Sequence, residues 1–225
     1  HKMFKELFLT NNVSFKAISL DEAGIMIEEL KKYNVNIAYV TPSHQFPTGT
    51  IMSISRRTEL LNWANENFNC YIIEDDYDSE FKYTGRPIPA LKANDINDKV
   101  IYLGSFSKSI SPAIRVSYLV LPKELLNIYQ KKLPYFICPV PTLNQKILYR
   151  FIKDGYFVKH INKMRTLYKK KREFLVNIIK TYSSKILDKE IYIQGADAGL
   201  HLVIKLNQKI NEKAFLKECL ENSLQ

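Results

Sequence analysis

Short apolar segments alternate with helical stretches along the first half of the chain, and this alternation constrains the fold more than any other feature. Strand-like apolar segments occur at residues 36–40, 70–74, 99–104 and 116–121. Helical spacing of apolar residues marks residues 21–33, with Asp21 as the expected start, and residues 55–68, headed by a capping serine. Near-continuous apolar strands separated by helices predict an α/β fold with a mostly parallel sheet flanked by helices on both faces.

After Pro122 the pattern becomes mainly helical. Helices are expected at residues 122–133, 141–152 and 155–182, a strand at 199–206 and a closing helix at 211–222. We therefore expect a partial large domain at residues 1–165 and the start of a small α+β domain at residues 166–225. The helix at about 155–182 would bridge the two.

Composition limits the class of protein. The chain has 225 residues, of which 46% are hydrophobic, so it can bury a sizeable core. No apolar run approaches the roughly 18 residues that span a bilayer, and no signal peptide is visible. Three widely spaced cysteines form no CxxC pair, as is typical of a reducing compartment, so we expect a cytoplasmic protein without membrane contact. Because residue 1 is a histidine, the chain is expected to be a piece of a longer protein.

Much of the net charge of +10 lies at residues 155–182, where lysine and arginine stand between apolar residues at helical spacing. A basic helical face can contact nucleic acid. We favour a long amphipathic helix with a solvated cationic face, because no zinc-finger spacing, RNA-binding aromatic pair or basic zipper accompanies it.

Three polar clusters directly follow three of the expected strands. They are TPSHQFPTG at residues 41–49, EDDYDSEF at 74–81 and GSFSKS at 104–109. Ligands of open α/β sheets bind at the carboxyl ends of the strands. The clusters should therefore meet at one crevice.

The third cluster contains Lys108 among small hydroxylic residues. A lysine desolvated in a crevice has a lowered pKa and a neutral amine suited to Schiff-base chemistry. Ser105, Ser107 and the turn backbone could hold a phosphate, and Arg115 offers a bidentate fork for the same anion. Taken alone, the motif is a weak signal and favours a solvated loop.

The second cluster places Glu74, Asp75 and Asp76 directly after a buried strand. A carboxylate there needs a cationic partner, and a protonated pyridine nitrogen is one such partner. Tyr77 could donate a hydrogen bond to a phenolate oxygen on the same ring. A solvated acidic turn and a metal site are the alternatives, and we expect no metal because His44 is the only nearby additional ligand. The first cluster is either a rigid turn that carries His44 and Gln45 into the crevice or a tight strand-to-helix connection.

Taken together, these motifs resemble a known family. In this order and spacing, TPSHQFPTG, RRTELLNWA, IIEDDYDSEFKYTGRPIPALKA and VIYLGSFSKSISPAIRVSYLVLP resemble the aminotransferase-like domain of MocR-type transcriptional regulators of the GntR superfamily. The resemblance continues into KHINKMRTLYKKKREFL and covers essentially the whole chain. It implies a fold type I pyridoxal 5′-phosphate (PLP) transferase-like domain.

The resemblance also implies roles for individual residues. Lys108 would carry PLP as an internal aldimine, Asp75 would pair with the pyridine nitrogen and Tyr77 would hydrogen-bond the phenolic oxygen. Ser105 and Arg115 would hold the phosphate, with Ser107 as a weaker candidate. The residues expected near the ring without an assigned role are His44 and Gln45.

The chain departs from a whole regulator of this family. It lacks the N-terminal winged helix-turn-helix, the first part of the PLP domain and the arginine that receives a substrate carboxylate, so we expect a fragment lacking both ends. The resemblance implies a homodimeric PLP-binding effector domain, which senses an amino compound or PLP itself and reaches DNA only through the absent winged helix. The alternative is a class I/II aminotransferase that acts on amino acids and 2-oxo acids, with Lys108 also moving the proton.

Overall fold

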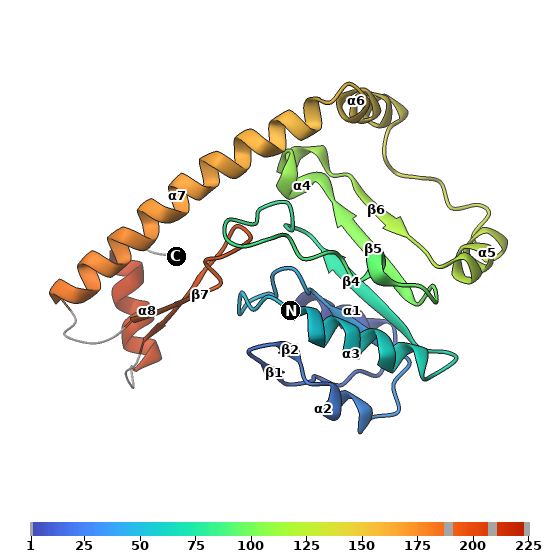
Figure 1. Cartoon of the computed structure of the whole chain (residues 1–225), viewed down its shortest axis with the longest axis horizontal. Helices are drawn as coiled ribbons and strands as arrows, with labels where there is room; N and C mark the ends of the chain where they lie inside the picture. Colours follow the sequence, from blue (N-terminus) through green and yellow to red (C-terminus); the bar gives the residue numbers. More distant parts are fainter. Residues whose placement is uncertain (1, 187–190, 207–210, 223–225) are drawn as a thin grey trace.

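The computed structural model describes residues 2–186, 191–206 and 211–222. A four-stranded sheet lies at its centre, with the order β3 (Ile37–Val40), β4 (Tyr71–Asp76), β5 (Val100–Ser105) and β6 (Ser117–Val120) (Figure 1). β3, β4 and β5 are parallel, and β6 pairs with β5 in the antiparallel direction. The prediction of a mostly parallel sheet flanked by helices is confirmed, with β6 as the antiparallel exception.

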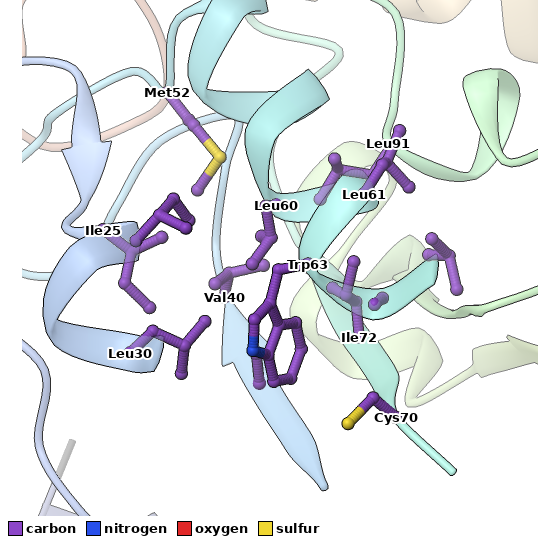
Figure 2. Packing of buried hydrophobic residues seen from close by; sticks show 14 residues of the cluster. Ile25, Leu30, Val40, Met52, Leu60, Leu61, Trp63, Cys70, Ile72 and Leu91 are labelled. Carbon is purple, nitrogen blue, oxygen red and sulfur yellow. The ribbon is translucent and has the colours of Figure 1, made fainter. Parts of the chain in front are cut away.

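The main core lies between this sheet and α3 (Ile54–Asn65) (Figure 2). Leu60 and Trp63 of α3 are buried against Val40 of β3 and Ile72 of β4. Burying each large apolar side chain stabilises the fold by about 1.5–3 kcal/mol. Ser53 caps the helix, because its hydroxyl accepts a hydrogen bond from Arg56 N at 3.2 Å.

The expected helix at residues 21–33 is wrong in its first half. β1 (Leu20–Asp21) and β2 (Gly24–Ile25) form a small hairpin there, and α2 covers only Ile27–Lys31. The Asp21 carboxylate accepts a hydrogen bond from Ala23 N at 2.8 Å, and Gly24 has a positive φ of 122°. Asp21 therefore closes a turn, because its side chain bonds the backbone two residues on.

The helices expected after Pro122 are present as α5 (Lys123–Lys132), α6 (Thr142–Lys153), α7 (Tyr156–Ile186) and α8 (Glu212–Glu221), and the strand expected at residues 199–206 is shorter, as β8 (Val203–Leu206). The sequence did not predict α1 (Lys2–Thr10), the 3-10 turn η1 (Lys92–Asn94), α4 (Phe106–Ser109), the 3-10 turn η2 (Pro112–Ile114) or β7 (Ile191–Gln194). α7 runs along one side of the molecule, from α6 to the β7–β8 hairpin and α8 (Figure 1). Among the described residues, none of the helices is both long and apolar enough to cross a bilayer.

Candidate functional site

A cavity of about 1100 Å³ runs along the whole length of β3 and reaches the end of β4. Its lining combines apolar side chains of the N-terminal segment with polar residues from all three sequence clusters. The polar and aromatic lining residues that matter for chemistry are Tyr39, Gln45, Phe46, Asp75, Tyr77, Asp78, Lys108 and His201. The polar clusters therefore converge on one cavity, as their positions after the strands predicted.

The alternation of side chains along β4 separates its three carboxylates. Asp75, like Ile73 and Tyr77, lines the cavity, whereas Glu74 and Asp76 are buried on the opposite face. Glu74 accepts hydrogen bonds from Leu91 N and Lys92 N at 2.8 and 2.9 Å. Of these three carboxylates, Asp75 is the one that lines the cavity.

Asp75 is half-buried beside an aromatic hydroxyl. Burial raises the pKa of the Asp75 carboxyl, and the negative charges of Asp76 and Asp78 add to this effect. The Tyr39 hydroxyl acts in the other direction, since it donates a hydrogen bond to Asp75 Oδ2 and so lowers that pKa. A buried carboxylate in this position is suited to a cationic ring nitrogen.

Removal of the Tyr39 hydroxyl should destabilise the fold, because Asp75 then loses its hydrogen bond from Tyr39. We expect Tyr39→Phe to lower the free energy of unfolding by about 1.5–3 kcal/mol at neutral pH, because the half-buried Asp75 carboxylate loses a charge-assisted hydrogen bond. Urea unfolding measures the change. Tyr33→Phe is the control, since Tyr33 lies outside this cluster. Equal stability of the Tyr39 variant and the wild type would contradict the assignment.

Lys108 belongs to the one-turn helix α4, directly after β5, and its exposed side chain lines the cavity. Ser105 caps this turn, because its hydroxyl oxygen accepts from Ser107 N at 3.2 Å. Arg115 ends the following η2 turn in the left-handed region with φ 50°, and its side chain is exposed. The lining of the cavity includes Lys108 but not Ser105, Ser107 or Arg115, which lie on the adjoining turns.

The turn at residues 41–49 is held by its own side chains. The Gln45 side-chain oxygen accepts from Thr48 N at 3.1 Å, and Gln45 lines the cavity. The Phe46–Pro47 peptide bond is cis. The Tyr77 hydroxyl donates to the His44 carbonyl oxygen at 2.6 Å, so Tyr77 braces this turn against the end of β4.

His44 itself points away from solvent and into a buried cluster. Its ring is 1% exposed and lies 3.1 Å from Asp78 Oδ2 through Nδ1 and 3.1 Å from the Gly195 carbonyl oxygen through Nε2. The His201 ring lies beside it, with ring centroids 4.1 Å apart. Burial lowers the pKa of the His201 imidazole, and the charge of His44 adds to this.

Sequence reasoning missed Tyr39, Asp78 and His201. Tyr39 carries a hydroxyl group in an otherwise apolar strand, and His201 interrupts the apolar run GLHLVIKL. Both departures from the apolar pattern were visible in the sequence, but the partners of these side chains come from distant parts of the chain. Asp78 is in the second cluster, in the bend two residues after the end of β4.

Comparison with known proteins places this geometry in a family. The model of the aminotransferase class I and II family matches residues 15–224. The chain is 40% identical over 220 residues to the uncharacterized HTH-type transcriptional regulator YdeL of Bacillus subtilis, covering 98% of this chain and 46% of that protein. It is 31% identical over 198 residues to the probable rhizopine catabolism regulatory protein MocR of Rhizobium meliloti, covering 88% of this chain and 39% of that protein.

A solved structure agrees with the sequence comparison. The α-aminoadipate aminotransferase LysN of Thermus thermophilus, complexed with N-(5′-phosphopyridoxyl)-L-leucine, superposes with a TM-score of 0.78 at 26% identity, covering 94% of this chain and 55% of that chain. The chain thus spans about half the length of the relatives it matches. The family match, however, extends over almost all of the present sequence. The chain therefore belongs to the aminotransferase class I and II family.

Proposed function

We propose that this chain is the PLP-binding effector domain of a PLP-dependent transcriptional regulator of the MocR type. The observation that carries the proposal is the shared cavity of Lys108, Asp75 and Tyr77. The identity of 40% to an HTH-type regulator, over 98% of the chain, favours a regulator over an enzyme. The phosphopyridoxyl ligand of the structurally similar LysN supports PLP as the cofactor.

The donor set of the cavity fits PLP. Asp75 would pair with the ring nitrogen, whose positive charge would offset the burial that raises the Asp75 pKa. Lys108 Nζ would bind the aldehyde carbon, and Tyr77 would lie at the phenolic oxygen. Ser105 uses its oxygen to accept from Ser107 N, so its hydroxyl proton can be donated to the phosphate. Ser107 and Arg115 would complete the phosphate site, and Gln45 and His44 would support the ring from the turn at residues 41–49.

PLP supplies an aldehyde that captures amines and a ring that withdraws electrons. The chain would contribute binding and recognition. Lys108 would hold the cofactor in the cavity that an amino compound would enter, and the apolar side chains that line the cavity would exclude water. A ligand that favours one arrangement of the domain shifts its population, and an attached winged helix-turn-helix would transmit this to DNA.

The proposal includes a cytoplasmic homodimer. Each subunit would contain a large domain at residues 1–165 and a small domain at residues 166–225. Tyr135, Phe136 and Ile137, between α5 and α6, are 93%, 73% and 88% exposed. Consecutive exposed apolar side chains of this size are typical of a contact surface, which supports an assembly.

Replacement of Lys108 tests the proposal in the full-length protein. We expect Lys108→Ala to abolish the visible absorption of lysine-linked PLP and the effect of amino compounds on DNA binding. Lys146→Ala, an exposed lysine on α6, should leave both unchanged. Absorbance after desalting and a DNA-binding titration measure the two effects. A Lys108→Ala protein that responds to amines like the wild type would overturn the proposal.

A second candidate, an aminotransferase, is favoured by the structural likeness to LysN. Lys108 Nζ would then move a proton during turnover. Conversion of an amino acid and a 2-oxo acid by the full-length protein in equal amounts, lost in Lys108→Ala, would establish this candidate. DNA binding without such conversion would favour the regulator.

A further inference from the structure

A second polar cluster lies at the edge of the cavity; the proposed PLP site gives His44 only a supporting place beside the ring and assigns no role to the other two members. It consists of His44, Asp78 and His201, whose ligand-capable atoms all lie within 4.8 Å of one another. His44 and Asp78 are 1% and 2% exposed, and Asp78 and His201 also line the cavity. The three residues come from the turn after β3, the segment after β4 and the segment before β8.

The hydrogen bonds of the two histidines determine which nitrogen of each ring is basic. His44 Nε2 lies 3.1 Å from the Gly195 carbonyl oxygen, which can only accept, so Nε2 carries the proton. His201 hydrogen-bonds the backbone of Pro47, and proline has no N–H. His201 is therefore also the donor in that bond. In each neutral ring the other nitrogen holds a lone pair.

The remaining nitrogen of each ring lies close to the Asp78 carboxyl group. His44 Nδ1 lies 3.1 Å from Asp78 Oδ2. His201 Nε2 and Asp78 Oδ1 are both buried, and neither has a hydrogen-bond partner among the residues that the structure describes. Asp78 Oδ2 also accepts a hydrogen bond from Leu200 N at 3.3 Å, so the unsatisfied atoms are Asp78 Oδ1 and His201 Nε2. Buried polar atoms without a partner are costly, and a cation bound by them removes the cost.

We propose that His44, Asp78 and His201 form a binding site for a divalent first-row transition-metal ion, with Zn²⁺ as the expected occupant. Two imidazoles and one carboxylate are a ligand set that such ions bind, with further positions left for water or ligand. For bonds of about 2.0–2.1 Å, tetrahedral ligands lie about 3.3 Å apart, close to the His44–Asp78 separation. Metal-binding histidines characteristically donate their other ring N–H to a backbone carbonyl, as both do here.

The sequence expectation of no metal rested on His44 as the only candidate ligand near the acidic cluster. The structure adds His201, which the sequence places far along the chain. An ion at this position would tie the turn at residues 41–49 to the segment at residues 195–201. Its open position would face the cavity that Asp78 and His201 line.

The test is equilibrium dialysis of the metal-stripped full-length protein against Zn²⁺ alone, followed by elemental analysis. We expect one Zn²⁺ per chain in the wild type. Asp78→Asn keeps the shape of the side chain, and His201→Phe keeps an aromatic ring beside Phe46, whose ring centroid is 5.6 Å from that of His201. Each variant should lose at least about tenfold in zinc affinity.

The matched control is His160→Phe, because His160 lies outside the cluster and bonds the Ser109 carbonyl oxygen at 3.0 Å. It should bind zinc like the wild type. Zinc should raise the midpoint of thermal unfolding of the wild type and of His160→Phe but not of the two cluster variants. Circular dichroism in chelator shows that each variant is folded, and His201→Gln replaces His201→Phe if the latter is not. Absence of stoichiometric zinc in the wild type, or equal affinity in the cluster variants, would overturn the site; the cluster is then a histidinium–carboxylate pair.

Discussion

Replacing Arg57 by methionine is expected to lower the free energy of unfolding by about 3–5 kcal/mol, because the change leaves a buried negative charge without its partner. Arg57 and Glu74 are 2% and 0% exposed, with Arg57 Nη1 3.8 Å from Glu74 Oε1. The guanidinium also donates to the carbonyl oxygens of Met52, Pro89 and Pro42 at 3.2, 2.9 and 2.9 Å. A methionine fills a similar volume but satisfies none of these acceptors.

Urea unfolding of the purified protein measures this loss. The control is Lys31→Met, which removes the exposed ion pair of Lys31 with Glu66, whose side chains are 44% and 58% exposed. An exposed pair of this kind is worth about 0–1 kcal/mol. Similar losses in the two variants would refute the view that burial makes the Arg57–Glu74 pair critical.

The second large effect is expected at Gly199, where even one methyl group has no space. Gly199 has φ +68°, and a Cβ atom there would lie 1.9 Å from His44 Nδ1 and 2.4 Å from Asp78 Oδ2. Left-handed backbone costs a non-glycine residue about 1–3 kcal/mol, and overpacking adds about 1–3 kcal/mol. We expect Gly199→Ala to destabilise the protein by about 3 kcal/mol or more and to abolish binding at the His44–Asp78–His201 cluster.

Gly155→Ala separates these two contributions. Gly155 has a similar φ of +77°, but a Cβ atom there would have no neighbour within 4 Å. Its substitution should therefore cost only the backbone contribution, about 1 kcal/mol. Thermal unfolding of both variants gives the comparison. If Gly199→Ala were no more harmful than Gly155→Ala, the close contact at the cluster would be disproved.

The sequence predicts the sheet because its strands follow rules that act locally. Residues 70–74 and 99–104 are short and apolar, and each is followed by a polar cluster, so both the strands and the cavity at their ends could be anticipated. The direction of β6 could not, since an apolar strand is equally compatible with parallel and antiparallel pairing. Asp21 shows another limit, because an aspartate that can cap a helix can also close a turn.

The site was predictable only in part, because some of its contacts join segments that are far apart in the sequence. Asp75 lies at the end of β4, and Tyr77, Lys108 and Gln45 lie in the segments that follow strands; all four line the cavity. Their roles toward PLP stay predictions, as do those of Ser105, Ser107, Arg115 and His44. The contacts of Tyr39 with Asp75 and of His44 with His201 depend on how distant segments pack, and no local pattern in one sequence encodes such pairs.

The long helix α7 is anchored close to the cavity and extends far beyond that anchor. Its middle is anchored to the segment after β4, because Arg165 Nε donates to the Glu80 carbonyl oxygen at 2.9 Å and the rings of Phe81 and Tyr168 lie 5.3 Å apart. Asp78, at the edge of the cavity, is only three residues from Phe81. From Tyr168 the helix continues for about 27 Å at about 1.5 Å per residue. By geometry alone, a rotation of about 10° at this anchor would displace the far end of the helix by about 5 Å, so the length of α7 beyond the anchor converts a small rotation into a larger displacement.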